Sequence, residues 1–189
     1  ALRNRLPQGA VLPDHAVKLV IDACVLFPTI LRSIVVGAAE KGVFTPIWSP
    51  RILEEWRRAV ARDGGDAGVD IALLNDRFPE AEIATAPEDS LWLPDPNDIH
   101  VLATAIAARA DGILTLNLKD FPTRTLSQHG VLRRDPDNVL LEAFSDDPDL
   151  ISEVVTGVLD KARVAGADAS PRALLKRARL PRLGKAMFG

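Results

Sequence analysis

Short apolar runs alternate with longer stretches of helical periodicity along the chain. This alternation is typical of a parallel sheet whose strands are connected by helices. The pattern predicts strands over residues 17–21, 43–48, 82–85, 112–116 and 131–133. It predicts helices over residues 26–41, 50–62, 69–78 and 96–110, a short helix beyond 122, and helices from about 136, 148 and 171. The fold class that follows is α/β, with a parallel sheet flanked by helices.

Two helix starts carry the same local signal, a capping residue followed by proline. Ser49 precedes Pro50, and Asp95 precedes Pro96. A short polar side chain accepts a hydrogen bond from a free N–H of the first turn, and proline suits the first helical position because it has no N–H to satisfy. These signals predict that one helix begins at residue 50 and another at residue 96.

Length and composition restrict the class of protein. The 189 residues, 47% of them hydrophobic and 26% charged, fit one medium globular domain or one domain with a small appendage. Polar residues interrupt every long apolar stretch, which argues against a membrane span and a secretory signal. The single cysteine, Cys24, excludes an internal disulfide and a cysteine-rich zinc site. We therefore expect a cytoplasmic protein.

The net charge of −3 is the sum of two very different segments. Residues 161–189 hold eight basic side chains and one acidic side chain, a net charge of +7, so the rest of the chain carries −10. Such a basic segment suits an approach to a polyanion. It also suits a solvated amphipathic helix that packs on the acidic part of the chain, and the two interpretations are compatible.

Acidic or amide side chains stand at four predicted junctions between a strand and a helix. They are Asp22, the pair Glu54 and Glu55, Asp98, and the pair Asn117 and Asp120. Each of them alone suits a turn or a helix cap. Together they predict a cluster of carboxylates at one sheet edge, which repel one another unless a divalent cation is present. Oxygen ligands without histidine or cysteine favour Mg²⁺ or Mn²⁺.

Four segments that contain these residues resemble the PIN-domain ribonucleases, and in particular the VapC-type toxins of bacterial toxin–antitoxin pairs. The segments are 20–26, 49–56, 95–103 and 114–122, and their order and spacing extend over residues 17–135. The resemblance implies a three-layer fold with a parallel sheet of four or five strands, and metal-dependent cleavage of RNA. It also implies a cognate antitoxin and a homodimer.

The resemblance assigns roles to single positions. Asp22 and Asp98 are expected as metal-site acids, and the family pattern favours Glu55 over Glu54 as another. The chain departs from the pattern at Asn117, where many relatives have an aspartate, so either Asp120 serves directly or Asn117 holds a water on the ion. Thr115 is expected to donate a hydrogen bond to the acids.

The predicted organisation is an N-terminal extension over residues 1–16, a PIN-like nuclease domain over 17–147 and a basic helical extension over 148–189. Six basic residues are expected to contact RNA: Arg51, Arg58, Arg62, Arg124, Lys176 and Arg177. The predicted function is an Mg²⁺- or Mn²⁺-dependent endoribonuclease. Two alternatives stay open, a catalytically inactive PIN-like module that binds RNA or protein, and a Mg²⁺-dependent phosphatase of another α/β family.

Overall fold

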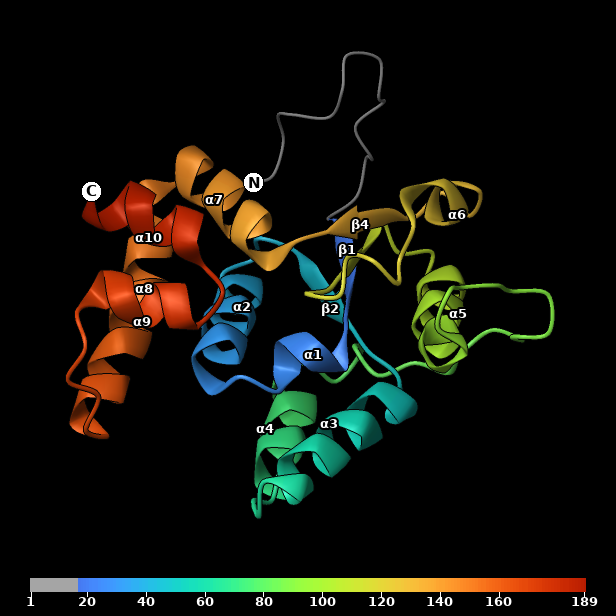
Figure 1. Cartoon of the computed structure of the whole chain (residues 1–189), viewed down its shortest axis with the longest axis horizontal. Helices are drawn as coiled ribbons and strands as arrows, with labels where there is room; N and C mark the ends of the chain where they lie inside the picture. The colour runs from blue at the N-terminus through green and yellow to red at the C-terminus, as the bar shows by residue number, and fades with distance from the viewer. Residues whose placement is uncertain (1–16) are drawn as a thin grey trace. The chain divides into compact units, whose positions relative to one another are not determined.

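The computed structural model describes residues 17–189 and divides them into two compact units (Figure 1). The predicted extension over residues 1–16 lies outside the described residues. We call Lys18–Phe27 together with Thr45–Asp135 the sheet unit. Pro28–Phe44 together with Pro136–Gly189 form the helical unit.

The sheet unit contains four parallel strands, which confirms the predicted α/β fold. They are β1 (Lys18–Ile21), β2 (Thr45–Ile47), β3 (Gly112–Leu114) and β4 (Leu132–Arg134), in the order β2-β1-β3-β4. The predicted strand over residues 82–85 is reduced to one isolated bridge between Trp48 and Glu82. The central strands β1 and β3 are almost wholly buried, so their apolar residues form the core of this unit.

Six helical segments surround these strands within the sheet unit. They are α1 (Ala23–Leu26), α3 (Pro50–Arg62), α4 (Gly68–Arg77), the 3₁₀ turn η1 (Pro96–Asp98), α5 (Ile99–Ala108) and α6 (Thr123–Ser127). The two predicted caps are present. Ser49 Oγ accepts a hydrogen bond from Ile52 N at 3.3 Å, and Asp95 Oδ1 accepts one from Asn97 N at 2.9 Å.

The helical unit consists of α2 (Thr29–Glu40), α7 (Pro136–Asp146), α8 (Pro148–Val164), α9 (Pro171–Arg177) and α10 (Pro181–Phe188). Helix α2 packs against α8, and α10 packs against both α7 and α9. Buried leucine side chains close the α9–α10 pair, among them Leu174, Leu175 and Leu183. Among residues 17–189, none of the helices combines the length and the apolar character that crossing a membrane requires.

Two predicted helices are interrupted. The helix expected over residues 26–41 begins only at Thr29, as α2, and Leu26 ends a separate short helix, α1, because Pro28 offers no N–H to a helix interior. The helix expected from Pro171 ends at Arg177, since Arg179 adopts φ +64° and Pro181 starts a new helix. Periodicity continues across both breaks, so it does not reveal them.

Candidate metal centre

The two central strands end side by side, and their next residues form the buried part of the site. Ile21 of β1 pairs with Leu114 of β3, and Asp22 N donates to Leu114 O at 3.1 Å. Asp22 and Thr115 are therefore neighbours at the carboxyl end of the sheet. Thr115 Oγ1 donates to Asp22 Oδ2 at 2.7 Å, and both residues are buried.

The Asp22 carboxylate is held by side chains and does not cap the helix that follows it. Cys24 Sγ donates to Asp22 Oδ2 at 3.1 Å and accepts from Leu116 N at 3.3 Å. Burial, together with the nearby Asp22 carboxylate, raises the pKa of the Cys24 thiol to about 12. The thiol therefore keeps its proton at neutral pH. Asn117 N donates to Thr115 Oγ1 at 3.0 Å, which fixes that hydroxyl as a donor to Asp22.

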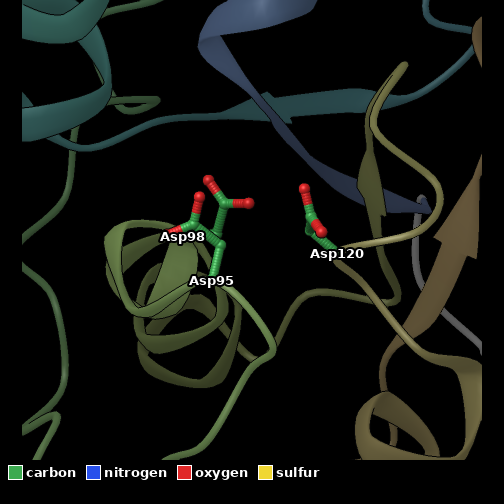
Figure 2. Close-up of side chains that lie close together, drawn as sticks. All are labelled: Asp95, Asp98 and Asp120. Carbon is green, nitrogen blue, oxygen red and sulfur yellow. The ribbon is translucent and has the colours of Figure 1, made fainter.

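Three half-buried carboxylates lie together next to this pair. Asp95 and Asp98 belong to the start of the η1–α5 segment, and Asp120 belongs to the loop after β3 (Figure 2). One oxygen of each lies within 4.8 Å of the others. Carboxylate oxygens at such separations are ligands for a hard divalent cation.

Asn117 lies between two of these carboxylates. Its Nδ2 group donates to Asp120 Oδ2 at 2.6 Å and to Asp98 Oδ2 at 3.4 Å. The amide hydrogens therefore offset part of the repulsion between Asp98 and Asp120. Of the two predicted alternatives for the fourth acid, Asp120 is in the carboxylate cluster, and the Asn117 amide nitrogen faces the same acids.

Two further acids, Asp22 and Glu55, act electrostatically on the cluster. Burial, followed by the charges of Asp22, Asp95, Asp120 and Glu55, raises the pKa of Asp98 to about 6. Four carboxylates thus act on the partly buried Asp98. Their all-oxygen chemistry and mutual repulsion fit a divalent cation, which removes the repulsion when it binds.

The two candidate glutamates of α3 have different surroundings. Glu54 pairs with Arg58 at 2.8 Å and with Arg57 at 3.8 Å on the exposed side of the helix. Glu55 Oε1 lies 2.8 Å from His100 Nε2 and 3.7 Å from Arg51 Nε, and its charge acts on Asp98. The geometry therefore favours Glu55 as the glutamate of the site.

His100 is fully buried, and neither of its ring nitrogens makes a hydrogen bond of good geometry. Its close approach to Glu55 is a contact at short distance with unfavourable angles. His100 belongs to α5, which begins just after Asp98, and its imidazole packs against the Glu55 carboxylate.

The residues predicted to contact RNA are distributed over both units. Arg51 pairs with Glu55 and with Glu88, and Arg58 pairs with Glu54. Arg62 and Arg124 are exposed on the sheet unit. Lys176 and Arg177 are exposed on α9 and belong to the helical unit.

Sequence reasoning missed two contributions to the site. It treated Asp95 only as a helix cap, whereas this carboxylate caps the η1 turn and also lies in the cluster. Its position three residues before Asp98, on the same side of one turn, is the signal that identifies it. The pattern also gives no sign that the buried His100 lies against Glu55.

Residues 18–119, more than half of the chain, match the family described as PIN domain. A shorter segment of 63 residues is 36% identical to VapC50 of Mycobacterium tuberculosis (strain ATCC 25618 / H37Rv), whose name gives ribonuclease as its provisional activity. This match covers 33% of the chain and 37% of that protein, so the chain spans well under half of its curated relative. No solved structure is significantly similar to the chain.

Proposed function

The chain belongs to the PIN-domain family, and we propose that it is a metal-dependent endoribonuclease that hydrolyses phosphodiester bonds in RNA. The observation that carries this proposal is the convergence of Asp95, Asp98 and Asp120, with Asp22 and Glu55 acting on the same site. Such a concentration of carboxylates is costly unless a cation compensates it, and divalent cations are common partners of phosphate esters.

We further propose that the chain is the toxin of a toxin–antitoxin pair and acts in the cytoplasm. The similarity to VapC50 supports this role. The partners would be an RNA substrate, a cognate antitoxin protein and a second copy of the chain. In this proposal residues 17–147 form the nuclease domain and residues 148–189 form an accessory basic extension.

The proposed ligands of Mg²⁺ or Mn²⁺ are the carboxylates of Asp22, Glu55, Asp98 and Asp120, joined by Asp95. A bound cation supplies Lewis-acid chemistry, because it lowers the pKa of water and stabilises the charge that develops on phosphate oxygens. Thr115 and Cys24 keep one oxygen of Asp22 occupied and so fix the direction of its carboxylate. Asn117 holds Asp98 and Asp120 at a constant separation.

Cleavage of a mixed cellular RNA pool tests the proposal. The purified full chain is incubated with Mg²⁺ or Mn²⁺, and again with EDTA. We expect cutting that EDTA abolishes. In Asp22→Asn and in Asp98→Asn the rate should fall by more than the roughly 10–100-fold that loss of a partner around a ligand causes.

Asp89→Asn is the matched control, since Asp89 lies in an exposed loop and the same charge is removed there. Its cutting rate should equal that of the wild type. Full activity of Asp22→Asn or Asp98→Asn would reject the assignment of the site. A folded wild-type protein that binds RNA but cuts none of it with either metal would favour the inactive RNA-binding alternative.

A further inference from the structure

Helices α9 and α10 and the turn between them carry a group of exposed cations. Among the described residues, no side chain forms an ion pair or hydrogen bond with the charged groups of five exposed residues, which are Arg172, Lys176, Arg177, Arg179 and Lys185. The sixth cation, Arg182, differs because its side chain donates to Asn138 Oδ1. The basic surface defined by these five residues is called the basic hairpin below.

The apolar side of the basic hairpin is buried by packing. Leu174, Leu175 and Leu183 are buried. A Cβ atom at Gly184 would lie only 3.2 Å from Leu175 Cβ, so the two helices are in close contact. Asp137 accepts hydrogen bonds from Arg182 N at 2.8 Å and from Leu183 N at 3.0 Å, which anchors the first turn of α10 to α7.

Lys176, Arg177 and Lys185 lie in the last turns of their helices, where the dipole favours cations, but the placement of Arg172 is unfavourable for the isolated chain. Arg172 and Lys176 are one helical turn apart, where like charges repel. Arg172 also lies in the first turn of α9, where the helix dipole disfavours a cation, and neither α9 nor α10 has an acidic residue in its first turn. Residues 136–160 hold seven acidic side chains and no basic one, yet none of the five cations pairs with them. Pairing within residues 17–189 therefore does not account for the basic hairpin.

We propose that the basic hairpin docks the phosphate backbone of single-stranded RNA, an inference that rests on the proposed ribonuclease function. The candidate metal centre is rich in carboxylates and repels a polyanion, so a phosphate chain needs cations elsewhere to bind. Arginine guanidinium groups donate two parallel hydrogen bonds to a phosphate, and lysine adds a point charge. Three of the five cations are arginines, presented along two packed helices.

The test measures RNA binding separately from cleavage. A labelled single-stranded RNA is titrated with the full chain carrying Asp22→Asn, in EDTA, over a series of salt concentrations. Into this background are introduced Arg172→Gln, Lys176→Gln and Arg177→Gln together. The slope of log K against log salt is negative, and each lost phosphate contact reduces its magnitude by about 0.7 for a single strand. The triple variant should therefore reduce the magnitude by about 2.

The matched control removes the same charge from other parts of the helical unit: Lys41→Gln, Lys161→Gln and Arg163→Gln. Lys41 and Arg163 pair with Glu153 and Asp160, and the slope of this control should stay that of the parent. An unchanged slope in the hairpin triple, or an equal fall in both triples, would overturn the proposal. Equal affinity for a duplex DNA of the same length would also overturn it.

Circular dichroism shows whether the hairpin triple keeps its helices. If it does not, Lys176→Gln and Lys185→Gln are measured singly, and each should reduce the magnitude of the slope by about 0.7. Failure of this inference and failure of the proposed function are distinguishable. Metal-dependent cutting by the wild type, with an unchanged slope in the hairpin triple, rejects only the docking surface. A slope of smaller magnitude in the hairpin triple, without any cutting by the wild type, rejects only the nuclease.

Discussion

At the scale of single residues, the Asp98 carboxyl decides how the site responds to pH. Burial and four neighbouring carboxylates raise its pKa to about 6, against about 3.9 in an unfolded chain. The folded state therefore binds this proton more tightly than the unfolded state does. Asp98 therefore destabilises the folded state least below about pH 4. The free energy of unfolding falls as pH rises from about 4 to about 6, where the carboxyl ionises more readily in the unfolded state.

Asp98→Asn should consequently stabilise the metal-free protein at pH 7.5 and have little effect at pH 4. Thermal unfolding in EDTA checks this, with a rise of about 2–4 °C for each kcal/mol of repulsion removed. Half-exposure of the carboxyl keeps the gain modest, because solvent screens its charge. Asp89→Asn serves as the control and should shift neither midpoint. A lower midpoint for Asp98→Asn at pH 7.5 would contradict the argument.

Cys24 provides a second prediction at this scale. A thiol with a pKa of about 12 has roughly 1,000-fold less thiolate at pH 8 than an ordinary cysteine has, and the thiolate is the reactive form. A disulfide reagent such as DTNB should therefore react far more slowly with the folded protein than with the protein in guanidinium chloride. Asp22→Asn should speed the reaction of the folded protein, because the Asp22 charge contributes to the raised pKa. Native and denatured rates within tenfold of each other would refute this account.

At the residue scale, the place of a side chain can be predicted from sequence where one chain position decides it. Asp22 directly follows β1, so its place at the sheet edge is fixed by the strand. The choice between Glu54 and Glu55 was open, because Ile52, Leu53 and Trp56 are all buried and both glutamates flank that face. The structure shows different partners for the two side chains: Arg58 pairs with Glu54, and His100 lies against Glu55. The spacing of apolar residues along the helix does not predict such contacts.

At the scale of elements, predicted boundaries are good where capping chemistry sets them. Helix α3 has the predicted limits of residues 50 and 62, since Ser49 and Pro50 fix its start. The predicted strand over residues 82–85 fails because a strand needs a partner along its length, and only Glu82 pairs, with Trp48. The break at Arg179 was equally hidden, because glycine usually signals a left-handed residue and here an arginine adopts that conformation.

The packing of α2 on α8 gives a prediction about one glycine. A Cβ atom at Gly37 would lie 2.8 Å from Val154 Cγ1, and this valine is buried and stiff about its first torsion. Overpacking costs about 1–3 kcal/mol. The better helix propensity of alanine offsets about 1 kcal/mol of this cost. Gly37→Ala should therefore lower the free energy of unfolding, measured by urea denaturation.

Gly157→Ala is the matched control on α8, because a Cβ atom there meets no other atom within 4 Å. It gains the helix propensity without the clash, so it should raise the free energy of unfolding by about 0.5–1 kcal/mol. Equal changes in the two variants would show that α2 and α8 do not pack as described.

For the whole molecule, the segregation of charge is more informative than the net charge of −3. The chain outside residues 161–189 carries −10; three of its acids converge in one cluster, and Asp22 and Glu55 act on Asp98 there. A cation that binds the folded state and not the unfolded state adds stability by mass action. At about 100 times its dissociation constant the gain is about 2.7 kcal/mol. Mn²⁺ should therefore raise the unfolding temperature of the wild type above its value in EDTA.

The same linkage predicts that two proteins exchange their order of stability. In EDTA at pH 7.5, Asp98→Asn should unfold at the higher temperature, because it lacks the repulsion that Asp98 feels. In saturating Mn²⁺ the wild type should unfold at the higher temperature if Asp98 is a ligand as proposed, because the variant then lacks one ligand oxygen and gains less from the ion. Asp89→Asn should follow the wild type in both conditions. An equal Mn²⁺ shift in the wild type and Asp98→Asn would mean that the ion stabilises the protein elsewhere, and the carboxylate cluster would no longer be the metal centre.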